Sequence, residues 1–331
     1  MKILLVGRFL PERLDLSYQR AFRKLGCEVI CFDIGDVNKF LRVCWEAIVN
    51  KKIRHVLDTF KPDLLLVMKG LYLWPRTIRE IKAVKKNLIF CFNSDNPFNL
   101  SSPATSNKNI LDSIPYYDCY FIWSRLLIEP LYKMEARCVE YLPFGFDPDL
   151  HYPVNLADNE ARIYGNDVVF VGNWDEEREA WLKELGDFDL GLWGSSYWRY
   201  RCRNRILRDR WRGKVVIGEE MSKVLNVSKI SLNILRKQNK LSHNMRTFEA
   251  PACGAFVLAE RTQEAKDFFE EDKEAVYFSS PEELREKVCY YLKNEPERKR
   301  IAQAGYLRCI RSNCSYLYLA KQILDCYKKL L

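Results

Sequence analysis

The chain has 331 residues, 48% of them hydrophobic, and this length favours two domains of ordinary size with substantial cores. No apolar run is long enough to span a bilayer. The formal net charge of +9 is moderate for this size and fits a polyanionic partner, a membrane surface or only solubility.

Strand-like and helix-like segments alternate through the first half of the chain. Compact apolar runs predict strands at residues 2–7, 27–34, 62–70, 87–98, 119–124 and 137–146. Helical spacing predicts helices at residues 16–26, 37–60, 75–84 and 125–135. This alternation predicts an open parallel sheet that is covered by helices on both faces.

A polar segment at residues 147–165 contains prolines and lacks periodicity, and we interpret it as a linker. Strands are then predicted at residues 166–174, 189–195, 214–219, 230–235, 255–260 and 275–280, and helices at 178–186, 281–294 and from 296 onward. We therefore expect an N-terminal domain (1–150), a C-terminal domain (165–312) and a last helix (313–331) that packs back on the first domain. Ligands bind at the carboxyl ends of strands in such sheets, so the expected site is the cleft between the two halves.

The 12 cysteines lie within apolar runs such as VICFD and IFCFN and form no CxxC pair, which predicts reduced, mostly buried thiols. The three histidines, His55, His151 and His243, lack the spacing of zinc ligands, so no metal site is expected. The first residues, MKILLVGRF, contain too short an apolar stretch for a signal peptide. We therefore expect a cytoplasmic protein.

One acidic residue stands out in the stretch HNMRTFEAPACGAFVLAE (residues 243–260). A helix that begins near Asn244 would offer free N–H groups to an anion, and Arg246 would add a charge-assisted contact to a phosphate. Glu249 follows about one turn later, and its carboxylate could accept hydrogen bonds from two vicinal hydroxyls. Pro251 removes a helix hydrogen bond and predicts a short or bent helix.

Several motifs resemble one enzyme family. The segments YLPFGFDPDLHYP, FVGNW, ISLNIL, NMRTFEAPACGAF and YFSSPEEL resemble those of GT-B glycosyltransferases of group 1, in particular the group related to the spore-maturation protein CgeB. The first half resembles this family mainly in its layout and in FNSDNPF. The resemblance implies an α/β protein of GT-B fold, with two Rossmann-like doubly wound domains facing across a cleft. The first domain would bind the acceptor and the second a nucleotide-sugar.

The resemblance also implies roles for individual residues. Glu249 would bond the ribose hydroxyls, and the residues before it would approach the diphosphate: Asn244, Met245, Arg246 and Thr247. The loop that follows the first strand of the second half would approach phosphate through Gly172, Asn173 and Trp174. Gly172 permits close backbone approach, and Arg178 in the next helix would balance negative charge.

The sequence departs from this family at one position that bears on the reaction. Many retaining members carry two glutamates separated by seven residues, but the partner position of Glu249 is Leu241. The stereochemical outcome therefore stays open between retention and inversion.

Other residues have two interpretations each. Asp95, at the end of a strand in FNSDNPF, is a general base facing an acceptor hydroxyl or part of a turn before Pro97. Asp15 is a second candidate base, or a helix N-cap or surface acid. Trp193 and Gly218 border a nucleotide base, or Trp193 only fills the core. Arg236 and Lys240 reach the phosphates or belong to an exposed basic loop.

The sequence DFD (residues 187–189) imitates a metal-binding motif, but it precedes a strand and follows the helix-ending Gly186, so we interpret it as a turn. No metal is required if helix dipoles and basic groups neutralise the leaving diphosphate. The arginine-rich residues 198–214 form a solvated helix, a face that attracts the acceptor, or a surface that meets anionic lipid. No motif supports nucleic-acid binding.

Two functions remain. The first is a metal-independent glycosyltransferase of hexosyltransferase type that moves a sugar from a UDP-, GDP- or dTDP-sugar to a hydroxyl of a cell-surface glycan, lipid-linked sugar or protein. This enzyme would be cytoplasmic or peripheral at the inner membrane face. The second is a GT-B module that binds a nucleotide-sugar without turnover, and it is motivated by the missing second glutamate.

Overall fold

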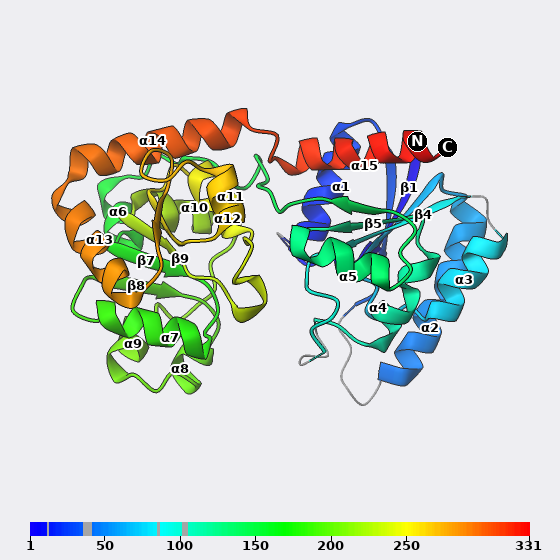
Figure 1. The fold of residues 1–331 in the computed structure, drawn as a ribbon, viewed down its shortest axis with the longest axis horizontal. Helices are drawn as coiled ribbons and strands as arrows, with labels where there is room; N and C mark the ends of the chain where they lie inside the picture. Colours follow the sequence, from blue (N-terminus) through cyan, green and yellow to red (C-terminus); the bar gives the residue numbers. More distant parts are fainter. Residues whose placement is uncertain (12, 36–41, 85–86, 101–104) are drawn as a thin grey trace. The chain divides into compact units, whose positions relative to one another are not determined.

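The computed structural model describes residues 1–11, 13–35, 42–84, 87–100 and 105–331. The chain divides into two compact units, residues 1–144 with 316–331, and residues 145–315. Each unit is built around one parallel β-sheet with helices packed against it (Figure 1). The predicted α/β architecture with two doubly wound halves is confirmed.

The first unit has a sheet of six strands in the order β2-β1-β3-β4-β5-β6. The strands are β1 (Lys2–Gly7), β2 (Glu28–Asp33), β3 (Leu64–Met68), β4 (Leu88–Asn93), β5 (Cys119–Ile122) and β6 (Val139–Tyr141). The helices of four or more residues are α1 (Leu14–Lys24), α2 (Arg42–Phe60), α3 (Pro75–Val84), α4 (Lys108–Ser113), α5 (Ile128–Lys133) and α15 (Tyr316–Leu330). Of the predicted helix at residues 37–60, residues 37–41 lie outside the described part of the chain.

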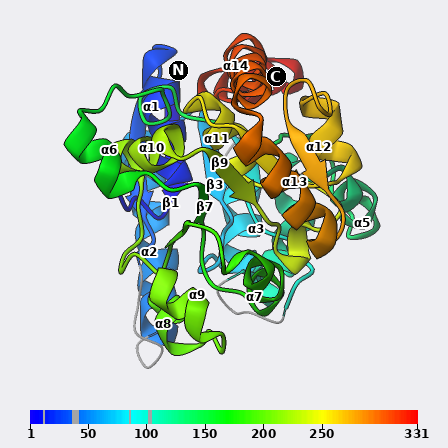
Figure 2. The same cartoon turned by 90° about the vertical axis from the view of Figure 1, so that its left-hand side faces the viewer.

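The second unit has a sheet of five strands in the order β11-β10-β9-β7-β8. The strands are β7 (Val168–Val171), β8 (Leu190–Trp193), β9 (Ile230–Asn233), β10 (Val257–Glu260) and β11 (Val276–Phe278). The helices are α6 (Asp158–Tyr164), α7 (Glu176–Leu182), α8 (Tyr197–Tyr200), α9 (Arg205–Arg210), α10 (Gly218–Val227), α11 (Arg246–Ala252), α12 (Gln263–Phe268), α13 (Pro281–Lys293) and α14 (Glu295–Arg311). Figure 2 shows α10 and α13 on opposite sides of β7 and β9.

The last helix belongs to the first unit although it follows the second in the sequence. Figure 1 shows α15 (red) beside α1 (blue). The Tyr18 and Tyr316 rings, both buried, lie 5.3 Å apart between their centroids. Apolar burial of this amphipathic helix therefore completes one layer of the first unit.

Two predictions about the second unit are wrong. Residues 214–219 form no strand, because this segment only meets the edge of β8 through single bonds such as Gly194 N to Lys214 O, and Gly218 already begins α10. The segment 147–165 is not an unstructured linker: it contains α6 and folds as part of the second unit. The short helix expected from Pro251 is confirmed, since α11 ends after seven residues.

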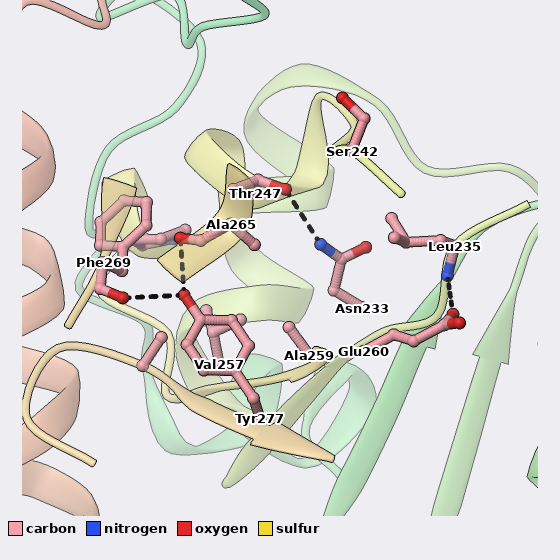
Figure 3. Close-up of a pocket in the computed structure, with 12 residues that line it drawn as sticks. Asn233, Leu235, Ser242, Thr247, Val257, Ala259, Glu260, Ala265, Phe269 and Tyr277 are labelled. Carbon is pink, nitrogen blue, oxygen red and sulfur yellow. Dashed lines mark hydrogen bonds between the residues drawn. The ribbon is translucent and has the colours of Figure 1, made fainter. Parts of the chain in front are cut away.

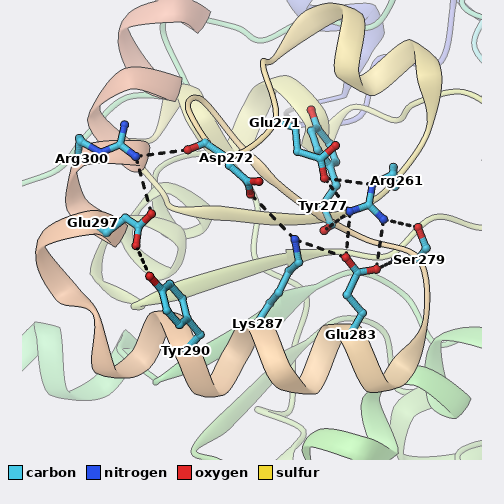
Figure 4. A network of polar contacts seen from close by, with 10 residues as sticks. All are labelled: Arg261, Glu271, Asp272, Tyr277, Ser279, Glu283, Lys287, Tyr290, Glu297 and Arg300. Carbon is cyan, nitrogen blue, oxygen red and sulfur yellow. Dashed lines mark hydrogen bonds and ion pairs between the residues drawn. The ribbon is translucent and has the colours of Figure 1, made fainter.

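A saturated ion cluster fixes one side of the second unit. Arg261, which directly follows β10, bonds Glu271 and Glu283 as well as Ser279 and the carbonyl of Tyr277 (Figure 4). The Arg261 guanidinium holds the pKa of Glu283 at about 2. The cluster ties β10 to α13 and uses every nitrogen of the guanidinium.

The twelve cysteines are all free, and seven of them are buried, as the sequence predicts. None of the helices in the described part of the chain is both long and apolar enough to cross a membrane.

Candidate functional site

The side chains that open α11 hold it to the end of β9. Asn244 Oδ1 accepts from the Thr247 backbone N–H at 3.2 Å, and Asn244 Nδ2 donates to Asn233 Oδ1 at 2.8 Å. Asn233, the last residue of β9, also donates to Thr247 Oγ1 at 3.3 Å. The side chains of Asn244 and Thr247 are therefore satisfied within the protein. These contacts place the start of α11 at the carboxyl edge of the sheet, where ligands bind in such folds.

Glu249 lies inside the second unit with both carboxylate oxygens in polar contact. Only 5% of the residue is exposed. Arg246 Nη1 lies 2.9 Å from Oε2, and His151 Nε2 lies 3.7 Å from Oε1. The spacing of three residues on one helix brings Arg246 and Glu249 to the same face. His151 comes from the segment that the sequence indicates as a linker, and no motif marked it as a site residue.

Arg246 has hydrogen-bonding capacity that the protein does not use. Its Nε atom is buried and has no hydrogen-bond partner among the described residues. Its Nη1 atom contacts Glu249 and the sulfur of Met221 in α10. A buried donor without a partner costs free energy, and in a native protein it calls for an explanation such as a bound anion.

The loop after β7 is organised by Arg178. Its Nε and Nη2 atoms donate to the Ile234 carbonyl at 3.0 and 2.8 Å, and Nη1 donates to the Asn173 carbonyl at 3.1 Å. The side chain is buried, and this burial lowers the pKa of Arg178 to about 10, with the nearby Arg236 acting in the same direction. Arg178 thus clamps the β7 loop to the end of β9, and its donors are already occupied.

Two glycines let the ends of β7 and β8 approach each other. A Cβ atom on Gly194 would fall 2.1 Å from the Gly172 carbonyl oxygen. The Gly172 N–H donates to the Trp193 carbonyl, and its carbonyl accepts from Trp198 Nε1. Gly172 therefore has a packing reason as well as its predicted phosphate role. Because its N–H already donates to the Trp193 carbonyl, this N–H is not available to a phosphate.

The other predicted residues of this unit differ in their exposure. Trp193 is buried and packs near Tyr164, which fits the core alternative, and Trp174 is half-buried with its Nε1 bonded to Glu179. Gly218 begins α10 with a φ of +54°, and Met245 is half-buried next to Arg246.

Arg236 and Lys240 follow β9 and contribute differently to the charge at this edge. Lys240 Nζ pairs with Glu177 Oε2 at 3.2 Å. Arg236 is half-exposed and forms no ion pair within the described ranges, and its charge acts on the buried Arg178. Arg236 is thus the more available cation of the two. Both assignments to phosphate stay predictions.

Glu260 is a further acid at this edge that the sequence analysis missed. It ends β10, and its Oε2 accepts from the Leu235 N–H at 3.1 Å. Burial raises the pKa of Glu260. Its position as the last residue of a buried parallel strand is the signal that could have identified it.

A small cavity lies behind this edge, between the sheet and the helices α11 and α12 (Figure 3). Asn233, Thr247 and Glu260 are among its lining residues. Its volume of about 10 Å³ holds at most one water molecule. The cavity is therefore a small packing void in the core and is too small to bind a nucleotide.

In the first unit, the candidate base Asp95 follows β4. Its carboxylate pairs with Lys69, which follows β3 and has a positive φ of 72°. The turn chemistry is present too: the Asp95 N–H donates to Asn93 Oδ1, and the Phe98 N–H donates to Asn96 Oδ1. The turn interpretation of Asp95 thus has a structural counterpart, and its role as a general base stays a prediction.

Asp15 lies in the first turn of α1 and is not its N-cap, which is Arg13. Asp15 Oδ1 accepts from the Arg8 N–H at 3.1 Å and fills the space beside Gly7 where a Cβ would stand. Burial raises the pKa of Asp15. It is therefore not the simple surface acid that the alternative interpretation describes.

Both acids of the predicted DFD turn form hydrogen bonds within the second unit. Asp187 forms a two-bond pair with Arg285, and Asp189 accepts from Asn166 Nδ2 and from the Asp167 N–H. Within the described ranges, no group of three or more histidine, cysteine, aspartate or glutamate side chains could hold a metal ion.

Comparison with solved structures defines the class of the fold. The sucrose-phosphate synthase of Thermosynechococcus elongatus superposes with a TM-score of 0.76 at 13% identity, covering 100% of this chain and 99% of that one. A glycosyltransferase from Rickettsia africae gives 0.70 at 14% identity, covering 99% and 98%. HepE of Anabaena, in complex with UDP and glucose, gives 0.68 at 12% identity, covering 99% and 100%. The chain has the GT-B fold.

The sequence itself places the chain in a family. A family model described as glycosyl transferase-like matches residues 157–325, which is just over half of the chain. The protein belongs to this glycosyl transferase-like family. No curated protein sequence matches the chain.

Proposed function

We propose that the protein transfers a sugar from a nucleoside-diphosphate sugar to an acceptor hydroxyl, with the donor held by the second unit. The observation that carries this proposal is the Arg246–Glu249 pair. A buried carboxylate and a guanidinium with an unused donor lie together on the first turn of α11, at the carboxyl edge of β9. Membership of the glycosyl transferase-like family and the UDP complex of HepE support a nucleotide donor.

Glu249 is suited to the ribose because a carboxylate has about four lone-pair sites and so can accept from two vicinal hydroxyls. Arg246 is suited to the diphosphate because guanidinium groups bind phosphate oxygens with charge-assisted bonds. Arg236 adds a second cation. Such positive charge stabilises the negative charge that develops on the leaving diphosphate, and we propose that it does so without a metal ion.

The helix itself contributes less to this site than the sequence suggests. With seven residues, α11 has a small dipole, and the side chains of Asn244 and Thr247 are bonded to the protein. The predicted approach of residues 244–247 to the diphosphate would therefore depend mainly on the Arg246 side chain, because the backbone N–H groups of Asn244 and Thr247 already donate to each other's side chains.

The acceptor is assigned to the first unit. Asp95 is the proposed general base, and Asp15, whose pKa is raised by burial, is the second candidate. If Asp95 is the base, Asp95→Asn lowers kcat at least 100-fold and leaves the dissociation constant of the donor nucleotide unchanged. A variant with wild-type kcat would remove Asp95 from the mechanism.

The first test measures the donor site directly. Titration calorimetry with UDP, GDP, dTDP and CMP identifies the nucleotide that binds, and turnover of the matching sugar donors then separates an enzyme from the inactive binding module. Glu249→Ala should weaken binding of that nucleotide at least 30-fold. Its circular dichroism should still be that of a folded protein, with a lower melting temperature because Arg246 loses its buried carboxylate. Glu270→Ala, an exposed acid in the same unit, is the matched control. Wild-type affinity in the Glu249 variant would contradict the proposal.

A peripheral membrane contact is the second part of the proposal. Residues 198–214 contain all of α8 except its first residue, Tyr197, together with α9 and the flanking segments. The side chains of Tyr197, Tyr200 and Ile206 are half-exposed or more. The exposed arginines that accompany them are Arg199, Arg201, Arg203, Arg205, Arg208 and Arg212. Trp198, by contrast, is buried in the core. A basic surface with exposed aromatic and aliphatic groups suits anionic lipid.

Sedimentation with vesicles tests this contact. Vesicles of phosphatidylglycerol should bind the protein and vesicles of phosphatidylcholine should not, and replacing Arg199, Arg203 and Arg205 by glutamate should abolish the difference. Equal binding to both kinds of vesicle would contradict an electrostatic membrane contact.

A further inference from the structure

The segment that delivers His151 to Glu249 is a tight turn. The Leu150 and His151 N–H groups donate to the Asp147 carbonyl at 3.0 and 2.8 Å, and the Asp149 N–H donates to Asp147 Oδ1 at 3.1 Å. These bonds fix the backbone of residues 147–151 independently of any ligand. The turn therefore presents His151 in a defined direction.

This turn is anchored on the helices that form the site. Ser222 Oγ, in α10, donates to the Leu150 carbonyl at 2.7 Å. It also lies 3.2 Å from the sulfur of Cys253, the residue that directly follows α11. His151 itself is 7% exposed. The turn thus closes over the Glu249 side chain from within the second unit.

The hydrogen bonds of His151 define its tautomer. The Asp147 N–H donates to Nδ1 at 3.0 Å, so Nδ1 acts as an acceptor and carries no proton. The ring proton is then on Nε2, the atom that lies 3.7 Å from Glu249 Oε1. This distance is slightly longer than a hydrogen bond, and a small movement of either side chain would form one.

The remaining acceptor capacity of Glu249 matches the ligand that is proposed for it. A carboxylate offers about four lone-pair sites. Arg246 occupies one on Oε2, and Nε2 of His151, which lies 3.7 Å from Oε1, would occupy one there. About two sites remain, one on each oxygen, which is the arrangement that two adjacent hydroxyl groups require.

We propose that His151 is a positioning residue for Glu249: its Nε2–H holds Oε1 so that the carboxylate presents one free lone pair on each oxygen to the two ribose hydroxyls of the donor. This inference rests on the proposed function. It adds a residue that touches no part of the substrate and acts only through Glu249. His151 therefore contributes to recognition of the ribose and to no other part of the nucleotide.

The test uses the full chain and a nucleotide with and without its ribose hydroxyls. Titration calorimetry with UDP, GDP and CMP, the candidate nucleotides that carry both ribose hydroxyls, identifies the nucleotide that binds, and its 2′,3′-dideoxy form is then titrated in parallel. His151→Phe fills the same space without a donor, and His151→Gln restores an N–H donor. Glu249→Gln is the reference variant. His151→Leu replaces the phenylalanine variant if that one does not fold.

We expect His151→Phe to weaken binding of the ribonucleotide about tenfold and to leave binding of the dideoxy form within twofold of the wild type. His151→Gln should recover most of the loss, and Glu249→Gln should show the same selectivity with a larger effect. An equal loss for both nucleotides, or no loss, in His151→Phe would overturn the role of His151 while Glu249 still discriminates. If Glu249→Gln does not discriminate, or if none of the nucleotides binds, the proposed donor site fails and this inference fails with it.

Discussion

Two arginine–carboxylate clusters in the second unit use the same chemistry for different ends. Arg261 bonds Glu271, Glu283, Ser279 and a backbone carbonyl, so each of its nitrogens has a partner (Figure 4). Arg246 meets one carboxylate and a methionine sulfur, and its buried Nε has no hydrogen-bond partner among the described residues. A saturated guanidinium stabilises the fold, whereas an incompletely bonded one has capacity for a ligand.

A third arginine has a hydrogen-bond partner for each nitrogen without contacting any carboxylate among the described residues. Arg178 gives its donors to the carbonyls of Ile234 and Asn173 and lies buried beside the proposed phosphate region. We therefore interpret it as a clamp that fixes the site, and we place the phosphate contacts on Arg246 and Arg236.

The largest effect on stability is expected for Arg178→Met. The change leaves the Ile234 carbonyl buried without its donors and should lower the free energy of unfolding by about 3 kcal/mol. Urea denaturation followed by circular dichroism measures the loss, and Arg199→Met, at an exposed site, is the control. A variant as stable as the wild type that has lost nucleotide binding would show that Arg178 acts on the ligand instead.

The next effect separates the two ion clusters. Arg246→Lys keeps a cation beside the buried Glu249 carboxylate but removes the Nε donor, so it should weaken nucleotide diphosphate binding about 10-fold and leave the melting temperature nearly unchanged. Arg261→Met should do the reverse. Calorimetric titration and thermal melting of both variants give the two affinities and the two melting temperatures. The same change in both variants would contradict the division of the two arginines into one that binds ligand and one that stabilises the fold.

The Arg261 cluster also predicts a pH dependence of stability. The pKa of Glu283 is held at about 2, below its ordinary value of about 4.3, so its contribution is fully present above about pH 4.5 and is lost as pH falls toward 2. In Glu283→Gln this part of the acid destabilisation should be absent. Melting temperatures between pH 2.5 and 7 test this, and an unchanged acid slope in the variant would contradict it.

The smallest effect is expected from the two basic residues after β9. Arg236→Ala should weaken binding of the nucleotide diphosphate a few-fold, because the charge of this half-exposed side chain is partly screened by solvent. Lys240→Ala should have less effect, since Lys240 is already paired with Glu177. A Lys240 variant that loses more affinity than the Arg236 variant would reverse this ranking.

The sequence predicts the architecture well because apolar strands and turn residues are local signals. All six strands of the first sheet, and the strands β7 to β11 of the second, lie within predicted segments. The prediction of a strand at residues 214–219 was wrong because Val215 and Ile217 lie at alternate positions, as on one face of a strand, but both are exposed beside the edge strand β8. Alternation alone does not reveal whether a neighbouring strand is available for pairing.

The site was only partly accessible from the sequence. Glu249 and Arg246 could be paired because their spacing places them on one helix face. His151 could not be found in this way, since it reaches Glu249 through a turn 98 positions earlier in the chain (249 − 151). The inward orientation of Asn244 and Thr247 depends on Asn233, whose side-chain direction is set by the sheet.

The position of the turn at residues 147–151 constrains how the second unit could be exchanged between related proteins. A recombination that took residues from 165 onward would leave behind His151, which contacts Glu249, and Leu150, to which Ser222 is bonded. The exchanged piece would carry the arginine and the glutamate without the histidine that faces them. An exchanged segment that keeps the site intact must therefore start at residue 145 or earlier. The helix that begins at Tyr316 would stay with the protein that receives the segment, because it belongs to the first unit.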